Sequence, residues 1–134
     1  MKTKAIKQTV KFAAKPFEVY EQLMDAKKHS AFTGTKATMS KKPKGKFSVY
    51  DGYCHGFNIE LVEGKKILQA WHFAEEGWPD DHYSICLFDL KKDGTGTKLT
   101  FVQTDVPEHK VDALKDGWKT YYWKPMKEAL KKKK

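Results

Sequence analysis

Hydrophobic and polar residues alternate with a period of two over most of the chain. The run Lys4–Phe12 alternates first, and six further segments between Lys36 and Val106 do the same, separated by turn sequences such as Asp51-Gly52. Alternation predicts strands with one buried face, and short turns favour antiparallel pairing because a parallel return needs a long crossover. The six later strands are predicted at Ala37–Met39, Lys46–Tyr50, His55–Val62, Lys66–Ala74, His82–Leu90 and Thr97–Val106.

Two regions have apolar residues at spacings of three and four instead, which is typical of helices. The first begins at Pro16, and a short second helix is expected over Ala26–Phe32, ended by Gly34. The second region follows Pro107 and predicts the longest helix of the chain, kinked by Pro125. The predicted buried stripes are Phe17, Tyr20, Leu23 and Met24 in the first region, and Leu114, Trp118, Tyr121, Tyr122, Met126 and Ala129 in the second.

The order of these elements predicts an α+β fold. One strand, two short helices, a six-stranded antiparallel stretch and a long helix form a curved sheet with helices on one face. The chain contains neither an internal repeat nor a Gly/Ser/Pro-rich linker, so residues 1–134 are expected to form a single domain.

Strand parity predicts which side chains face the long helix. The inner face is mostly apolar and contains a few polar members, a composition typical of small-molecule sites. The pattern leaves two alternatives open: a ligand cavity, or a filled core in which each His or Gln bonds to a neighbouring group. The cavity candidates are Phe47, His55, Phe57, Ile59, Gln69, Trp71, Phe73, Phe101, Gln103 and Asp105 on the strands, with Trp118 and Tyr122 on the long helix.

The positive charge of the chain comes entirely from lysine. There are 26 lysines and no arginine against 17 carboxylates, a formal net charge of +9, and the run Lys131–Lys134 ends the chain. Base recognition and phosphate clamping favour the planar arginine fork, so specific nucleic-acid binding is not expected. The lysines lie mainly in turns, on outer strand faces and at a helix terminus, which indicates a solvated surface with some attraction for an acidic protein surface.

The remaining composition excludes several classes of protein and site. No signal peptide or membrane span is recognisable, and the two cysteines are too few for a disulfide scaffold, so we expect a cytoplasmic protein. The histidines and cysteines lack the spacing of a metal site, and no cofactor-binding motif is present. His55 with Asp105 is the one candidate for a catalytic acid–base pair, and we expect a protein that is not an enzyme.

An ordered series of short motifs resembles a known group of proteins. The motifs include Ala31-Phe32-Thr33-Gly34, the run from Gly45 to Gly52, Gly56-Phe57, the run from Leu61 to Ile67, Trp71-His72-Phe73, Trp78-Pro79 with His82, and the run from Gly117 to Tyr122. Together they resemble the SRPBCC superfamily (START and birch-pollen-allergen-like proteins), and within it the C-terminal domain of the activator of the heat-shock-protein-90 ATPase. The resemblance covers the chain from about Lys4 to Leu130.

The resemblance implies a helix-grip fold, in which a curved antiparallel sheet wraps around a long C-terminal helix. It also implies a hydrophobic ligand between sheet and helix, or a role in the stress response as a co-chaperone that stimulates ATP hydrolysis by a heat-shock-protein-90-type chaperone. The activator carries a separate N-terminal domain and this chain has none, so a stand-alone domain is expected. Three hypotheses follow: a non-enzymatic domain that binds a hydrophobic small molecule or a partner protein, a co-chaperone, and an enzyme of the cyclase or dehydratase kind.

Overall fold

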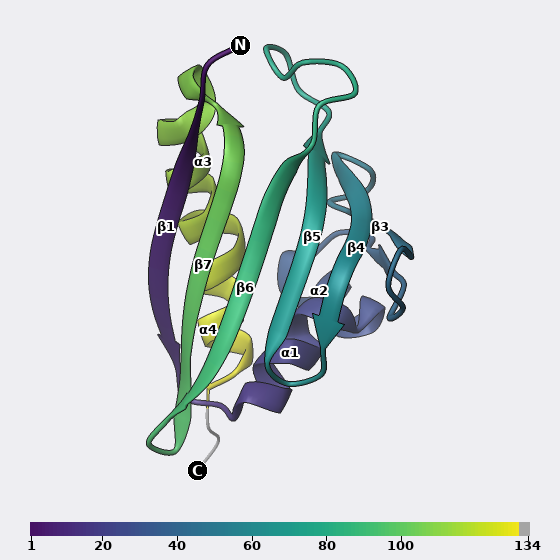
Figure 1. Ribbon diagram of the computed structural model, residues 1–134. Coiled ribbons are helices and arrows are strands. Elements are labelled where there is room, and N and C mark those ends of the chain that lie inside the picture. Colours follow the sequence, from purple (N-terminus) through teal and green to yellow (C-terminus); the bar gives the residue numbers. More distant parts are fainter. Residues whose placement is uncertain (132–134) are drawn as a thin grey trace.

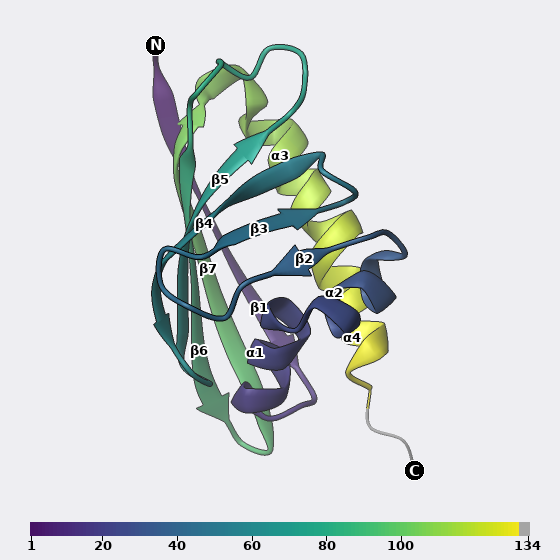
Figure 2. The ribbon, with the colours of Figure 1, turned by 90° about the vertical axis from the view of Figure 1, so that its right-hand side faces the viewer.

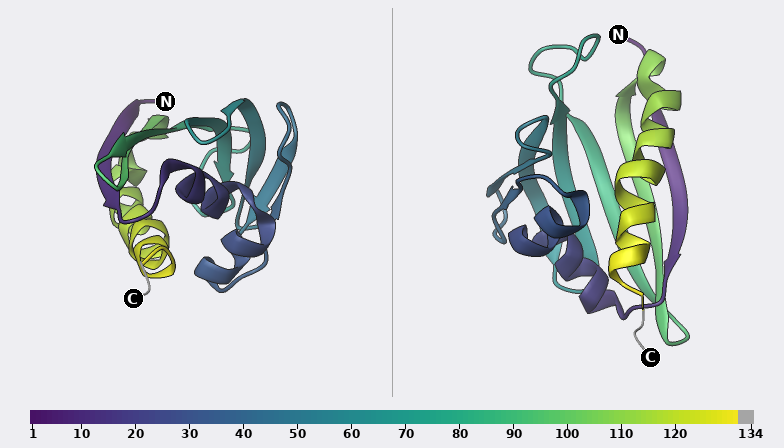
Figure 3. Two further views of the ribbon diagram at one scale, coloured as in Figure 1. Left: turned by 90° about the horizontal axis from the view of Figure 1, so that it is seen from below. Right: turned by 180° about the vertical axis from the view of Figure 1, so that it is seen from behind.

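A computed structural model describes residues 1–131 and consists of two layers (Figure 1). A curved antiparallel sheet forms one layer, and all the helices lie against its concave side (Figure 2). Seen from behind, the C-terminal helix crosses the sheet along most of its length (Figure 3). The predicted helix-grip fold is confirmed. Of the terminal lysine run, Lys132, Lys133 and Lys134 lie outside the described residues.

The sheet contains every strand that the alternation predicts. Its seven strands have the order β1-β7-β6-β5-β4-β3-β2, and each neighbouring pair is antiparallel. Because β1 pairs with β7, the first strand joins the far edge of a sheet whose other strands follow one another in sequence order. The strands are β1 Thr3–Phe12, β2 Thr38–Met39, β3 Lys46–Val49, β4 Cys54–Val62, β5 Lys66–Phe73, β6 Ser84–Asp93 and β7 Gly96–Pro107.

The two short helices close one end of the concave side. Helix α1 (Pro16–Met24) begins at a proline, where the missing N–H matters little, and α2 (Ala26–Thr33) ends at Gly34 with φ of 76°. Tyr20, Leu23 and Met24 are buried as predicted. The prediction for Phe17 is wrong, since half of this side chain is exposed. Val19 is buried instead, because the stripe is centred between Val19 and Met24 and Phe17 lies at its edge.

The long helix contains an irregularity that the sequence pattern did not reveal. It continues from the 3₁₀ turn η1 (Glu108–Lys110) through α3 (Val111–Trp118) and the π-helical turn η2 (Lys119–Trp123) to α4 (Lys124–Ala129). A π turn contains about one residue more than an α turn, so the side chains that follow it are rotated around the axis. The predicted burial of Tyr121 and Ala129 is therefore wrong, and Trp123 is buried in their place.

Pro125 follows this turn and removes one backbone donor. Without an N–H, it cannot bond the carbonyl of Tyr121 four residues earlier. The hydroxyl of Tyr50, directly after β3, donates to that carbonyl at 2.7 Å. This bond connects the long helix to the β3 side of the sheet, opposite the edge formed by β1.

Two β-bulges reverse which side chains face inward, so strand parity predicts the wrong face for the residues beyond them. In β4 the register shifts between Asn58 and Glu60, so Cys54, Gly56 and Asn58 face inward. The predicted inward orientation of His55, Phe57 and Ile59 is therefore wrong, and Phe57 and Ile59 are 38% and 40% exposed. Each bulge places one extra residue on one strand, which inverts the parity on its far side.

The second bulge affects Asp105 in β7. Ile6 pairs with Gln103 and Lys4 with Val106, so two β7 residues lie opposite one β1 residue. Asp105 occupies this bulge with φ of 59° and is exposed, and Val106 takes the buried position. The predicted inward orientation of Asp105 is wrong for this reason.

Within the described residues, no helix is both long and apolar enough to cross a membrane. The core lies between the sheet and the helices, and both cysteines are free and buried.

Gly56 permits a close approach of β4 and β5 that no other residue allows. A Cβ atom at this position would lie 1.7 Å from the carbonyl oxygen of Ala70. Because backbone rather than a flexible side chain blocks the space, Gly56→Ala is expected to lower the free energy of unfolding by about 3 kcal/mol, measured by urea denaturation. The matched control is Gly117→Ala on α3, where the nearest atom is 3.9 Å from the added Cβ and helix propensity favours alanine by up to about 1 kcal/mol. Equal stability of the two variants would contradict the close approach.

Candidate functional site

The interface between sheet and long helix is filled by aromatic rings. Trp118 of α3 packs on Phe101 with ring centroids 4.4 Å apart and on Trp71 at 5.2 Å. Trp71 in turn contacts Phe47 at 5.0 Å and Tyr122 at 6.0 Å. Offset and edge-on pairs of this kind each add about 0.5–1.5 kcal/mol to area burial. Most of the grip is therefore a packed core.

The two predicted inner glutamines orient tryptophans in this core. The indole N–H of Trp71 donates to Gln69 Oε1 at 2.9 Å, and that of Trp118 donates to Gln103 Oε1 at 2.8 Å. The amide nitrogen of Gln69 donates to Asn58 Oδ1, and that of Gln103 to Ser84 Oγ, both at 2.9 Å. Both ends of each amide therefore bond within the protein, so the filled-core alternative holds for Gln69 and Gln103.

One pocket of about 440 Å³ remains at the end of the interface where α3 begins. Its floor is formed by Trp71, Phe73, Trp118 and Tyr122, which are buried. Tyr53 and Tyr121 lie at its rim and are 43% and 57% exposed, so the pocket opens to solvent between the β3–β4 turn and the helix. The lining residues are Tyr50, Tyr53, Cys54, Trp71, Phe73, Glu75, Ala113, Leu114, Gly117, Trp118, Tyr121 and Tyr122.

The polar groups of the pocket are few and lie near its mouth. The hydroxyl of Tyr53 donates to Glu75 Oε2 at 2.6 Å, and Lys110 Nζ lies 3.8 Å from the same carboxylate oxygen. Burial, followed by the nearby Glu75 charge, raises the pKa of the Cys54 thiol, so this group stays protonated and is a poor nucleophile. The pocket thus presents aromatic walls with one hydrogen-bonding corner at Glu75 and Tyr53.

A buried histidine supports the inner wall of the pocket. His29 of α2 lies 3.0 Å through Nδ1 from the carbonyl of Leu23 and 2.9 Å through Nε2 from the hydroxyl of Tyr122. A carbonyl only accepts, so Nδ1 carries the proton and Nε2 accepts from Tyr122. Burial lowers the pKa of His29 to about 4 and raises that of Tyr122, so both groups are neutral at pH 7. The hydroxyl proton of Tyr122 is therefore used within the protein, in the bond to His29.

The twelve cavity candidates fall into three groups. Four line the pocket, namely Trp71, Phe73, Trp118 and Tyr122. Four others are buried behind its walls, namely Phe47, Gln69, Phe101 and Gln103. The last four, namely His55, Phe57, Ile59 and Asp105, are exposed and do not line it. His55 and Asp105 consequently do not form an acid–base pair in the pocket.

Strand parity missed the pocket residues that lie beyond strand ends. Tyr50 and Tyr53 belong to the β3–β4 turn, and Glu75 to the loop after β5, where a period of two no longer applies. Leu114 and Tyr121 also line the pocket; they belong to the predicted helical stripe but are not among the predicted cavity candidates. The burial of His29 had one weak signal, its position three residues before Phe32 on the same helix face.

The described residues contain no group of three or more His, Cys, Asp or Glu side chains arranged to hold a metal ion. The aromatic pocket is the feature that suits a small organic molecule.

Comparison with known proteins agrees with this architecture. The family profile described as "Activator of Hsp90 ATPase homolog 1-like protein" matches residues 13–131. The chain belongs to this family. Within the activator family, the chain is 31% identical over 118 residues to an activator of 90 kDa heat shock protein ATPase homolog from Dictyostelium discoideum, covering 87% of this chain and 30% of the relative.

Other members of the activator family give the same picture. An activator of 90 kDa heat shock protein ATPase homolog 1 from Mus musculus is 30% identical over 120 residues, covering 89% of this chain and 35% of that protein. The chain thus spans about a third of the length of these two relatives. The crystal structure of an HSP90 activator from Plasmodium falciparum superposes with a TM-score of 0.84 at 22% identity, covering 94% of this chain and 95% of that one. A protein from Chromobacterium violaceum reaches a TM-score of 0.79 at 20% identity, covering 96% and 98%. These two structures show the shared fold.

The buried His29 predicts a loss of stability in acid. A histidine with a lowered pKa binds its proton more readily in the unfolded state, so stability is complete above the unfolded pKa of about 6.5 and falls as the pH approaches 4. The free energy of unfolding is expected to decrease by about 3 kcal/mol from pH 7 to pH 4 on account of this residue. Urea denaturation at several pH values measures the decrease.

Carboxylates titrate in the same range, so the test compares variants that retain them. His29→Gln is expected to be less stable at pH 7 and to show a shallower pH dependence than the wild type. His109→Gln, which removes an exposed histidine, should keep the wild-type pH dependence. Parallel curves for all three proteins would show that His29 does not cause the effect.

Proposed function

We propose that this chain is a non-enzymatic co-chaperone domain that binds an Hsp90-type chaperone and stimulates its ATPase activity. The observation that carries this proposal is the match of the activator family to residues 13–131. The Dictyostelium and mouse relatives are named as activators of the 90 kDa heat shock protein ATPase, which supports the choice of partner. A cytoplasmic location is part of the proposal, and the two free, buried thiols are compatible with it.

The chemistry of the pocket favours a non-enzymatic role. Among the described lining residues Glu75 is the one carboxylate, and it already accepts from Tyr53 and lies beside Lys110. General acid–base catalysis needs a group that can exchange a proton with a bound substrate, and Cys54 is held in its protonated form.

The co-chaperone proposal is tested by titrating the purified chain into an Hsp90-type chaperone and measuring ATP hydrolysis. A saturable increase in rate is expected, with a midpoint equal to the Kd measured by calorimetry under the same conditions. Hydrolysis that remains after addition of a chaperone-specific inhibitor is subtracted. An unrelated lysine-rich protein of similar net charge serves as the control for non-specific attraction, and neither binding nor stimulation above this control would refute the proposal.

The pocket supports a second role for the same domain, the binding of a hydrophobic small molecule. Seven aromatic rings line a space of about 440 Å³, which suits a flat apolar molecule with one polar end toward Glu75 and Tyr53. Pockets of this composition and size are typical ligand sites.

An anilinonaphthalene sulfonate dye serves as a probe of this second role. The exposed Ala113 lines the mouth, so Ala113→Phe is expected to occupy the pocket and weaken dye binding by roughly tenfold, as measured by fluorescence titration. Ala129→Phe, at an exposed alanine that does not line the pocket, is the matched control. Equal affinities for the two variants would place dye binding elsewhere.

A further inference from the structure

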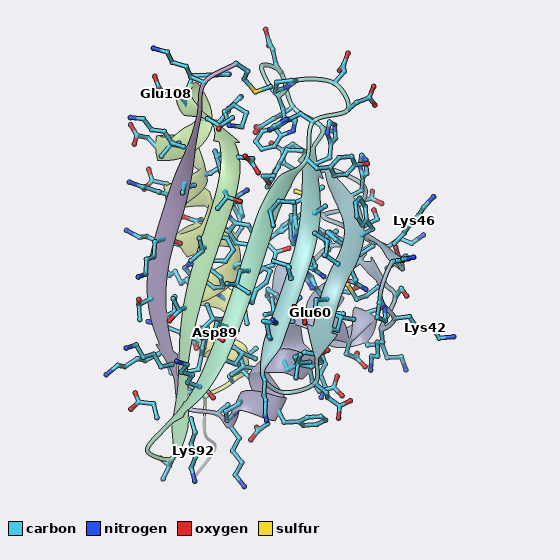
Figure 4. All side chains as sticks on the ribbon, viewed as in Figure 1. Lys42, Lys46, Glu60, Asp89, Lys92 and Glu108 are labelled. Atoms are coloured by element: carbon cyan, nitrogen blue, oxygen red, sulfur yellow. The ribbon has the colours of Figure 1, made fainter. Side chains whose placement is uncertain are left out.

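The convex face of the sheet lies opposite all the helices. Figures 1 and 4 view the molecule from this side, and among the described residues no helix covers it. Side chains of neighbouring strands that are register partners point to the same face of a sheet. The strand register therefore gives the composition of the convex face row by row.

Two adjacent rows of this face are apolar. In one row Phe57 pairs with Ala70 and Ala70 with Ile85, and in the next Leu68 pairs with Leu87 and Leu87 with Val102. Ile59 extends these rows at the β4 bulge and is 40% exposed. These residues form an apolar band across β4, β5, β6 and β7, consisting of Phe57, Ile59, Leu68, Ala70, Ile85, Leu87 and Val102.

The apolar band is unusual for a sheet with one solvated face. In such sheets the outward positions are normally polar and the inward ones apolar. Ile85, Leu87 and Val102 are only partly buried, although their inward neighbours Cys86, Phe88 and Phe101 are fully part of the core. Ala70 is itself buried at 1% exposure, so the exposed area of the band comes from the larger side chains around it. A contiguous, partly exposed apolar patch with a polar border typically marks an interaction surface.

An arrangement of lysines that is unfavourable in the isolated chain lies on the same face, separated from the band by the row that contains Asp89 and Thr100. Lys91 pairs with Lys98, and Lys98 pairs with Lys11, so three lysines stand in one row across β6, β7 and β1. Like charges directly opposite one another destabilise a sheet. Asp93 lies 3.6 Å from Lys11 and compensates for part of this row, which we call the lysine row.

Other lysines border the band at both edges. Lys7 is the partner of Val102 and Lys46 is the partner of Phe57, so each apolar row meets a positive charge at one end. At the other ends, Glu60 is the partner of Leu68 and Thr104 is the partner of Ile85. Lys46 projects from the sheet edge in Figure 4, which also labels Glu60 and Asp89. Glu60 is paired with Lys66 at 2.6 Å, and Lys66 is also the register partner of Asp89, so this one lysine offsets one of the two carboxylates. Counted together with Lys7, Lys46 and the lysine row beside Asp93, the charge around the band is net positive.

We propose that the apolar band and the lysine row together form the surface that docks a partner protein. The partner surface is apolar at its centre and acidic beside it. This inference rests on the proposed function, because it assigns the chaperone contact to a face of the chain. A second copy carries the same net charge of +9, so charge complementarity favours an acidic partner over self-association.

The first test changes the centre of the band. Leu87→Glu places a charge among apolar residues and is expected to weaken binding to an Hsp90-type chaperone at least about tenfold in Kd, measured by calorimetry. Phe17→Glu is the matched control, since Phe17 is an apolar residue on α1 that is half exposed. Circular dichroism and thermal unfolding establish that both variants are folded.

The second test changes charge without touching the band. Replacing Lys11, Lys91 and Lys98 together by Gln is expected to raise the Kd about three- to tenfold and to reduce its dependence on salt. The control replaces Lys27, Lys28 and Lys127 by Gln, three exposed helical lysines, so both triple variants have the same net charge. If the two triple variants bind equally, the lysine row is not part of the docking surface.

A third measurement uses the unmodified chain and so does not depend on the folding of variants. Lysine acetylation followed by mass spectrometry is expected to show Lys91 and Lys98 protected in the complex, while Lys27 and Lys28 remain reactive. Protection of the helical lysines instead would overturn the proposed face.

The outcomes separate this inference from the function on which it depends. A wild-type chain that fails to bind the chaperone refutes the proposed function, and with it this partner for the face. A wild-type chain that binds, with Leu87→Glu and the Lys11/Lys91/Lys98 variant binding equally well, refutes the face alone. A wild-type dimer in light scattering that Leu87→Glu converts to a monomer would assign the band to self-association and overturn the proposal.

Discussion

Three buried indole N–H groups fix the arrangement of the aromatic core between the sheet and the long helix. Each belongs to a tryptophan whose ring fills the grip, and each has lost its contact with water. Each N–H donates a hydrogen bond to the side-chain oxygen of a glutamine on a strand. The pairs are Trp71 with Gln69, Trp118 with Gln103, and Trp123 with Gln8. Leaving one such donor unpaired costs about 1–3 kcal/mol. The Trp118 and Trp123 bonds join the long helix to β7 and β1 and so fix its position along the sheet, whereas the Trp71 bond lies within β5 and orients a ring against which the helix packs.

These bonds also connect the floor of the pocket to other parts of the core. Gln69 continues to Asn58, whose amide donates to the carbonyls of Ser40 and Lys42, so the network reaches the loop between β2 and β3. The floor of the pocket is therefore part of a connected polar network inside an aromatic core. Its mouth is formed instead by Tyr53 and Glu75, which come from a turn and a loop. Residues at the mouth can thus change without disturbing the floor.

Most of the fold could be predicted from the sequence because its order depends on simple periodicities. All seven strands, the two short helices and the long helix follow from alternation, from spacings of three and four, and from turn glycines. The inner faces of β5 and of β7 up to Gln103 also follow, because those stretches contain no irregularity. The ordered motifs added the family, which periodicity alone does not supply.

Apart from Phe17, the errors about which side chains face inward have one common physical cause, a single extra residue that inverts or rotates the pattern beyond it. The bulge near Ile59 moved His55 and Phe57 outward, the bulge at Asp105 moved that residue outward, and the π turn exchanged Tyr121 for Trp123. Bulges and π turns depend on long-range pairing and packing rather than on local composition, so a period count cannot locate them. The bulge in β4 also places the apolar side chains of Phe57 and Ile59 on the convex face.

The hydrogen bond from Tyr50 to Tyr121 connects the two sides of the pocket mouth. Any motion that separates the β3–β4 turn from the helix breaks this bond and exposes a carbonyl for which Pro125 has no donor. The Tyr50 hydroxyl, together with its ring packed on Tyr121 and Tyr122, therefore holds the β3–β4 turn and the helix together at the place where the proline leaves the helix without its own bond.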